Sequence, residues 1–118
     1  LALAGGQVLQ HTPETRIDGA IRVAVDQGPG APPRGDFALE SKGGESYNRE
    51  QSGRYHSHLA SNHGRVVMSD GRTTYDGVVY LFDNQAQALV ALRGLQGRHP
   101  NIFIGYMDTG GAIRWVPR

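Results

Sequence analysis

Hydrophobic and polar residues alternate along several short segments of the chain, a pattern typical of β-strands with one buried face. Residues 20–26 alternate in this way, and residues 36–40 form a shorter segment of the same kind. Residues 64–69 and 77–82 are apolar and almost continuous, which also favours strands. A further strand is expected to begin within residues 54–59.

One segment has helical rather than alternating spacing. The apolar residues from Ala88 to Leu95 recur at intervals of three and four and predict a helix over about residues 84–96. Gly97 and Pro100 then end that helix. Residues 101–107 and 112–116 read as two strands around a Gly-rich turn, and we expect them to pair as a C-terminal hairpin.

These elements define an α+β fold, in which a mostly antiparallel sheet carries one main helix on one face. The chain has 118 residues, which fits a single domain. Residues 1–18 are predicted to form an extended or poorly ordered lead-in. Residues 27–35 and 41–53 are rich in glycine, proline or polar residues and are predicted to be long loops.

Composition excludes several classes of protein. The chain has no cysteine, which excludes disulfides, zinc–thiolate sites and cysteine nucleophiles. No apolar run approaches the roughly 20 residues of a membrane span. The net charge of +1 gives no strong prediction of nucleic-acid binding. All basic residues but Lys42 are arginines, which can clamp phosphate or carboxylate groups or simply reflect coding bias.

The densest group of ionisable residues lies between residues 54 and 63. His56 and His58 share one face of the predicted strand, and either can act as a general acid or base or can position a substrate. Arg54 and Arg65 are candidates for holding a phosphate. The histidine spacing matches no strong zinc motif, so we predict no metal.

Two further residues are candidates for catalysis. Tyr80 lies in the middle of the predicted strand over residues 77–82. It is either a core aromatic residue or a ring that stacks on a flat ligand. Asp108 ends the next strand, where it is either a turn residue or a group that stabilises positive charge on a ribose.

The segment from Val79 to Asn84, with the alanines and leucine that follow, resembles the tyrosine strand and helix of small ADP-ribosyltransferase-like toxins with a His-Tyr-acid signature. The resemblance implies that NAD is the substrate. It assigns the ribose-binding histidine to His58 or His56, the nicotinamide-stacking ring to Tyr80 and the late acidic residue to Asp108.

The first six residues, Leu-Ala-Leu-Ala-Gly-Gly, read either as the end of a secretory signal or as the junction left when a domain is cut from a longer polypeptide. They resemble the segment after the cleavage point of Rhs-type polymorphic toxins. This resemblance implies a bacterial toxin domain that is secreted or delivered into a target-cell cytoplasm and is neutralised by an immunity protein. We expect NAD or RNA as its target and no membrane as a partner.

Three hypotheses therefore stand side by side. The first is a toxin that transfers ADP-ribose from NAD or cleaves NAD through His58, Tyr80 and Asp108. The second is a metal-independent ribonuclease toxin, in which a pair such as Glu50 and His58 supplies base and acid. The third is a non-enzymatic binding domain whose Gly- and Pro-rich loops form the contact surface.

Overall fold

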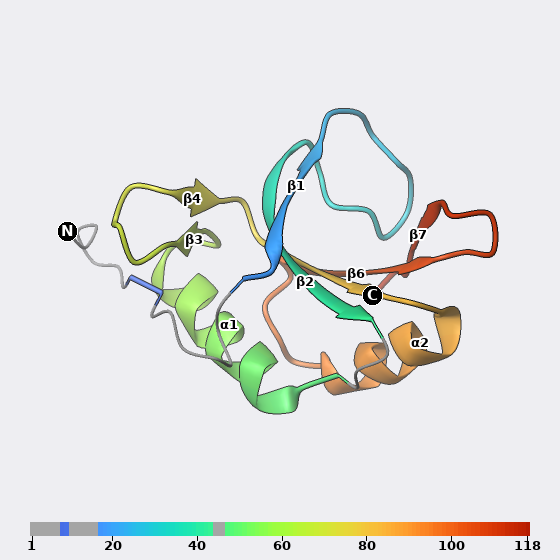
Figure 1. Ribbon diagram of the computed structural model, residues 1–118. Coiled ribbons are helices and arrows are strands. Elements are labelled where there is room, and N and C mark those ends of the chain that lie inside the picture. Colours follow the sequence, from blue (N-terminus) through green and yellow to red (C-terminus); the bar gives the residue numbers. More distant parts are fainter. Residues whose placement is uncertain (1–7, 10–16, 44–46) are drawn as a thin grey trace.

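The chain folds around one five-stranded sheet with two helices beside it (Figure 1). The computed structural model describes residues 8–9, 17–43 and 47–118. In chain order the elements are β1 (Gly19–Val23), β2 (Gly35–Gly43), α1 (Arg49–Ser61), β3 (Val66–Val67), β4 (Thr74–Tyr75), β5 (Val78–Phe82), α2 (Gln85–Gly94), β6 (Ile102–Met107) and β7 (Ile113–Trp115).

The predicted α+β class is confirmed. The sheet has the order β1-β2-β5-β6-β7, and β3 and β4 form a separate small ribbon. Of the five strand pairings, β1–β2, β3–β4 and β6–β7 are antiparallel, whereas β2–β5 and β5–β6 are parallel. The three central strands are therefore parallel to one another, and their carboxyl ends meet at one edge of the sheet.

Both helices lie on the same face of the sheet because both connect parallel neighbours. The chain leaves β2 and reaches β5 by way of α1, and it leaves β5 and reaches β6 through α2. Such crossovers are almost always right-handed, so two that step in the same direction place their helices on one face. α2 confirms the helix predicted over about residues 84–96, and β6 with β7 confirms the C-terminal hairpin.

The helix α1 corrects the prediction of a loop over 41–53 and a strand within 54–59. Its first turn is capped by Asn48, whose side chain accepts a hydrogen bond from the amide of Gln51 at 3.0 Å. Its inward face is largely polar, so the apolar periodicity of a helix is hidden in the sequence. The predicted strand over residues 36–40 was also too short, since β2 continues to Gly43.

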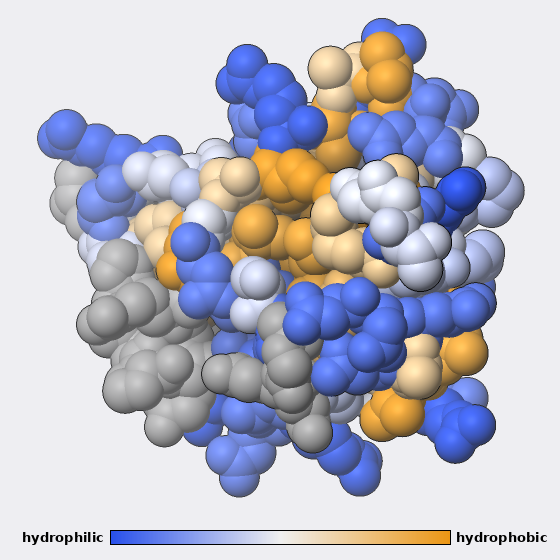
Figure 2. Space-filling model, turned by 45° about the vertical axis from the view of Figure 1, so that its right-hand side comes forward, coloured by the Kyte–Doolittle hydropathy of each residue, from blue (hydrophilic) through white to orange (hydrophobic). Residues whose placement is uncertain are grey.

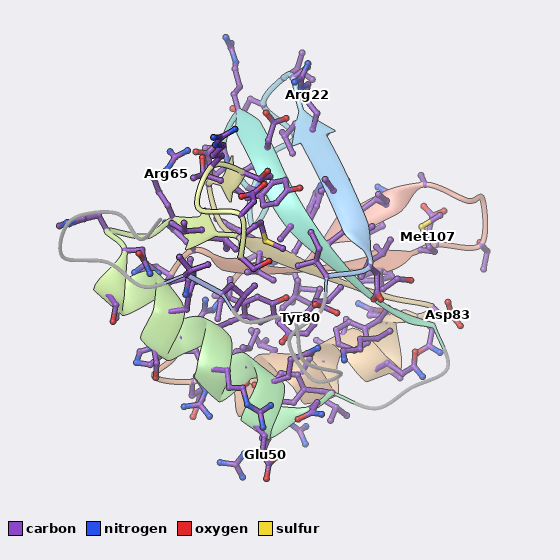
Figure 3. All side chains as sticks on the ribbon, turned by 60° about the vertical axis from the view of Figure 1, so that its left-hand side comes forward. Arg22, Glu50, Arg65, Tyr80, Asp83 and Met107 are labelled. Atoms are coloured by element: carbon purple, nitrogen blue, oxygen red, sulfur yellow. The ribbon has the colours of Figure 1, made fainter. Side chains whose placement is uncertain are left out.

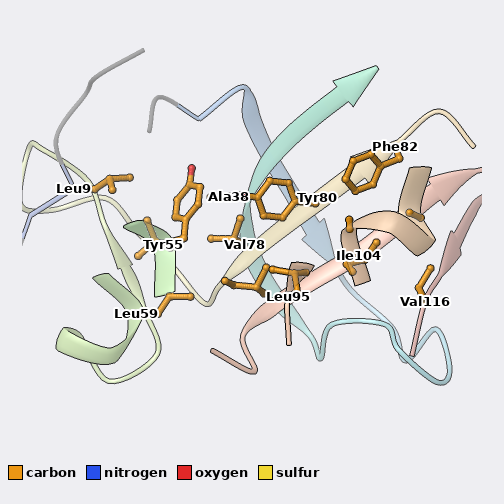
Figure 4. Packing of buried hydrophobic residues seen from close by; sticks show 14 of the residues in the cluster. Leu9, Ala38, Tyr55, Leu59, Val78, Tyr80, Phe82, Leu95, Ile104 and Val116 are labelled. Carbon is orange, nitrogen blue, oxygen red and sulfur yellow. The ribbon is translucent and has the colours of Figure 1, made fainter. Parts of the chain in front are cut away.

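The core lies between the sheet and the helices (Figure 4). Tyr80 and Phe82 of β5 stack at a centroid distance of 6.4 Å. Ala88 and Ala91 of α2, and Leu95 at its C-cap, are fully buried against this face. Burial of these side chains supplies the main stabilisation of the helix layer.

The opposite face of the sheet holds a smaller cluster of buried residues, centred on Val23, Phe37 and Val79. The loop between β1 and β2 reaches this side, where Trp115 Nε1 donates a hydrogen bond to Gln27 Oε1 at 2.8 Å. Figure 2 shows apolar side chains gathered in the middle of one side of the molecule and ringed by polar ones.

The predicted lead-in over residues 1–18 falls largely outside the described residues. Two of its described residues nevertheless belong to the domain. Leu9 is 4% exposed, and its amide donates to the carbonyl of Val67 at 2.6 Å. Asp18 immediately precedes β1 and lies beside β2, where its position matters for the site described next.

Candidate functional site

Buried polar side chains are the first indication of a site, since burying such groups is costly unless they are paired or used. They fall into two groups. His58 and Asn62 lie at the end of α1. The other group lies between the sheet and the first half of α1 and consists of Glu40, Lys42, Gln51 and Ser52.

Glu40 and Lys42 enter this space from β2. Alternate residues of a strand point to the same face, so Ala38, Glu40 and Lys42 share the side that carries the helices. Glu40 is 2% exposed and Lys42 is 6% exposed. A strand that carries two charged residues on its buried face, close to its carboxyl end, is unusual for a purely structural element.

A second carboxylate reaches Glu40 from the neighbouring strand. β1 and β2 are antiparallel with Gly19 opposite Leu39, and this register places Asp18 opposite Glu40. The Asp18 carboxylate accepts a hydrogen bond from the amide of Ser41 at 2.9 Å. Asp18 is exposed to solvent, so the two carboxylates connect the buried site to the surface at the β1 side.

The environment of Glu40 favours its protonated form. Burial raises the pKa of Glu40 to about 7, and the nearby Asp18 carboxylate adds to the increase. The hydrogen bond from Tyr55 and the charge of Lys42 act in the opposite direction. The Asp18 carboxylate therefore disfavours ionisation of Glu40, and a proton on Glu40 or a bound cation would relieve this repulsion.

α1 supplies the hydrogen bonds that hold the site. Gln51 and Tyr55 are four residues apart and therefore lie on one face of the helix. The Tyr55 hydroxyl donates to Glu40 Oε1 at 2.5 Å, and the Tyr80 hydroxyl donates to Gln51 Oε1 at 3.0 Å. These bonds fix one Glu40 oxygen and join β2, α1 and β5 in a single network.

Lys42 is the cation of the site. Its ammonium lies 5.7 Å from the centroid of the Tyr80 ring, in reach of a cation–π interaction. The ion pairs of the described residues do not include Lys42. A buried ammonium that forms no ion pair with the described carboxylates can bind an anionic ligand.

Of the residues predicted to be catalytic, Tyr80 belongs to this site, although it differs from the expected role. It has no exposed surface, and its ring packs edge-on against Tyr47 and Tyr55. Figure 3 shows Tyr80 pointing into the space between the sheet and the helices. Its hydroxyl orients Gln51, and its ring is enclosed by side chains rather than open to a flat ligand.

His58 and His56 lie on α1 and not on a strand. His58 is buried, and its Nε2 accepts a hydrogen bond from the amide of Val67 at 2.9 Å, which ties the helix to β3. Desolvation lowers the pKa of His58, in keeping with this acceptor role. His56 is half-buried, and its Nδ1 has no hydrogen-bond partner within the described part of the chain.

Asp108 lies in the turn of the C-terminal hairpin. Its carboxylate accepts hydrogen bonds from the amides of Gly110 and Ala112, both at 2.9 Å, and pairs with Arg114 at 2.9 Å. In the sheet Tyr80 is level with Ile104, so Asp108 lies four residues further along, or about 13 Å. The structure therefore does not bring Asp108 beside Tyr80, as the place of Met107 in Figure 3 also shows.

The two arginines predicted to bind substrate are separate from one another. Arg54 lies on the outer side of α1 and pairs with Glu50 at 3.6 Å. Arg65 bridges Asp76 and Thr74, both at 2.8 Å, and so braces the ribbon of β3 and β4. Each has a local partner within its own part of the fold.

The donors at the Asp18–Glu40 pair suit a hard divalent cation. Within the described residues, no group of three or more His, Cys, Asp or Glu side chains could hold a metal. Mg²⁺ does not require such a cage, because it commonly uses one or two carboxylates, several waters and the phosphate of the substrate. Two carboxylates, one of them open to solvent, meet that requirement.

Comparison with known proteins adds no further constraint. No protein-family model, no curated protein and no solved structure matches this chain. In the part of the chain that the structure describes, neither helix is long and apolar enough to cross a membrane.

Proposed function

We propose that this chain is a divalent-cation-dependent phosphodiesterase that cleaves nucleic acid. The observation that carries the proposal is the convergence of Asp18, Glu40 and Lys42, two adjacent carboxylates beside a buried ammonium that has no ion pair among the described residues. Carboxylates bind the cation, and a cationic group binds the anionic phosphate. Chemistry at a phosphate group uses both kinds of group at one point.

The chemistry of Asp18 and Glu40 favours an active form of the site in which the two carboxylates bind a cation rather than share a proton. A shared proton leaves the carboxylates as a weak acid and base, with only a buried lysine to contact substrate. Asp18 and Glu40 would hold a divalent cation, which would offset their negative charges and supply a Lewis acid for the phosphate oxygens. The Tyr55 hydroxyl holds one Glu40 oxygen in place.

Lys42 and Gln51 would assist the hydrolysis in different ways. In hydrolysis a water oxygen forms a bond to phosphorus, the bond from phosphorus to the leaving oxygen breaks, and the water proton ends on the leaving oxygen. Lys42 stabilises the charge that develops on the phosphate. Gln51 can orient the attacking water through its amide, because its carbonyl is occupied by the Tyr80 hydroxyl.

The hypothesis of NAD cleavage stays a prediction that no contact in this structure favours. His58 is used in holding α1 to β3, and Asp108 is used in its own turn. The ribonuclease alternative is closer to the present proposal, since it concerns the same class of substrate. The difference lies in the residues and in the requirement for a cation.

A cleavage assay tests the proposal directly. Single-stranded and duplex DNA and RNA are incubated with the protein in Mg²⁺ and, separately, in EDTA. We expect cleavage in Mg²⁺ and none in EDTA. Glu40→Gln and Lys42→Met should each lower the rate by about 100-fold or more, the usual cost of losing a group that stabilises transition-state charge.

The matched controls are Glu50→Gln and Asp108→Asn, which remove carboxylates away from Glu40. Both should cleave at the rate of the unmodified protein. Cleavage that continues in EDTA, or that survives Glu40→Gln in folded protein, would refute the assignment. Consumption of NAD that depends on Asp108 would restore the other hypothesis.

The proposed reaction also suits the resemblance to Rhs-type toxin domains. Cleavage of nucleic acid in a target-cell cytoplasm would be lethal, and an immunity protein would protect the producing cell. We propose this biological role together with the activity. Survival of bacteria that express the domain with Glu40→Gln, beside death with the unmodified domain, would support it.

A further inference from the structure

Eight arginines of the described ranges fall into two groups. Four of them form ion pairs with carboxylates: Arg22, Arg54, Arg65 and Arg114. Another four form no ion pair with a described carboxylate and gather where the start of α1 meets the end of α2 and the turn that follows. These are Arg49, Arg93, Arg98 and Arg118.

A hollow of about 340 Å³ lies beside these arginines. It is lined by Leu92, Arg93, Leu95, Gln96 and Arg118. No acidic residue contributes to its lining, and two of the five residues are cationic. We call it the basic hollow. Its size is within the range of pockets that hold small molecules or one unit of a polymer.

Main-chain carbonyls hold the guanidinium of Arg118 in position at the basic hollow. The Arg118 guanidinium donates hydrogen bonds to the carbonyls of four residues: Leu95, Arg98, His99 and Ile102. These bonds hold the charge in place without neutralising it. Arg93, in the last turn of α2, is exposed, and its side chain makes no hydrogen bond or ion pair with another described residue.

The basic character continues away from the hollow toward α1. Arg98 lies across Gly53, where its guanidinium would be 3.4 Å from an added Cβ, and it donates to the carbonyl of Arg49 at 3.4 Å. The pKa of His99 is lowered by burial and by the neighbouring His56 and Arg118. Arg98 Nε is buried without a hydrogen-bond partner in the described part of the chain.

We propose that the basic hollow, together with Arg98 and Arg49, binds the phosphate backbone of a nucleic-acid strand. This inference rests on the proposed function and names the surface that holds the polymer outside the Asp18–Glu40 pair. Arg93 contacts one phosphate in the hollow, and Arg98 and Arg49 continue the track toward α1.

The lining favours nucleic acid over an acidic protein segment. Leu92 and Leu95 give the hollow an apolar floor between the cationic groups. A nucleotide presents a flat apolar base or sugar face next to a phosphate, and both can be accommodated together. A carboxylate side chain would satisfy Arg93 but would leave the apolar floor uncovered.

Binding is measured by fluorescence anisotropy with a labelled single-stranded oligonucleotide and with its duplex, using the full chain in EDTA so that no cation-dependent cleavage occurs. The salt concentration is varied, because each phosphate contact contributes about 0.7 to the salt slope for a single strand. Arg93→Gln should lower the slope by about this amount and weaken binding about 5-fold at roughly 0.1 M salt. The control is Arg34→Gln, which removes the same charge from the exposed loop before β2.

A second pair of variants adds charge instead of removing it. Gln96→Glu places a carboxylate in the basic hollow, whereas Gln85→Glu places one at the other end of the same helix. Only Gln96→Glu should weaken binding. Equal effects of both members of either pair, or no effect of Arg93→Gln and Gln96→Glu, would overturn the inference.

The outcomes of the binding and cleavage assays separate the two proposals. Strand binding that depends on Arg93, without cleavage in Mg²⁺, would support the basic hollow and refute the proposed function. Cleavage that is unaffected by Arg93→Gln, with unchanged binding, would refute only the basic hollow.

Discussion

Replacement of Glu40 by glutamine tests the physical basis of the proposed site through stability. Glutamine keeps the size of the side chain and an oxygen that accepts the hydrogen bond from Tyr55, but it cannot ionise. In the unmodified protein the pKa of Glu40 rises from 4.5 to about 7 on folding, because the carboxyl is buried beside Asp18. The folded state therefore binds a proton that the unfolded state releases, and stability must fall as the pH rises.

The size of the effect follows from the two pKa values. As the pH rises from about 5 to about 8, the unmodified protein should lose about 2.5 kcal/mol of unfolding free energy relative to Glu40→Gln. The loss is smaller where solvent at Asp18 screens the charge. Below its unfolded pKa of 4.5 the group is protonated in both states and the difference disappears. Above its folded pKa of about 7 the full penalty is present.

The assay is denaturant unfolding at a series of pH values in EDTA, for the unmodified protein and for Glu40→Gln. Glu50→Gln is the control, since the Glu50 side chain is 82% exposed and its loss should not depend on pH in this way. Excess Mg²⁺ should then stabilise the unmodified protein at high pH, by about 2.7 kcal/mol at a hundred times the dissociation constant, but not Glu40→Gln. Parallel pH profiles for all three proteins would refute the raised pKa of the buried Glu40 carboxyl.

Two further predictions concern residues outside the site. His58→Gln should destabilise the protein by about 1–3 kcal/mol at neutral pH because the Val67 amide loses a buried acceptor, while the cleavage rate of the folded fraction stays unchanged. Because the pKa of His58 is lowered on folding, the stability contributed by His58 should be lost as the pH falls below 6.5. A cleavage rate that falls while stability stays unchanged would contradict this structural role. Gly77→Ala should destabilise the protein by more than about 2 kcal/mol, since the added Cβ would lie 2.4 Å from the carbonyl oxygen of Asn101. Gly97→Ala, at a residue with positive φ but open space around it, should cost about 1 kcal/mol. Equal decreases in melting temperature for the two variants would refute the steric argument.

The fold could be predicted where the hydrophobic pattern was regular. The strand before Asp83 and the helix after it follow from an apolar run that changes to helical spacing. α1 could not be predicted in this way, because Gln51, Ser52 and His58 occupy inward positions that a helix normally gives to apolar residues. Gly53 in its middle also favoured a loop.

The site could not be predicted because its residues become neighbours only through tertiary structure. Asp18 falls in the predicted lead-in and Lys42 in a predicted loop, so neither was considered for catalysis. Their approach to Glu40 depends on the register of β1 against β2 and on β2 continuing to Gly43. The spacing of Gln51 and Tyr55 has meaning only once α1 is known to be a helix.

The charges of the site account for the order in which cation and substrate would bind. Asp18, Glu40 and Lys42 together carry a net charge of −1 when both carboxyls are ionised, which would repel a phosphodiester. A proton on Glu40 makes the set neutral, and near neutral pH the raised pKa allows this state. A divalent cation instead changes the net charge to +1, which complements the single negative charge of a phosphodiester. The cation and the proton compete for the same pair, so affinity for Mg²⁺ should increase as the pH rises through about 7, and the phosphate should bind after the cation rather than before it.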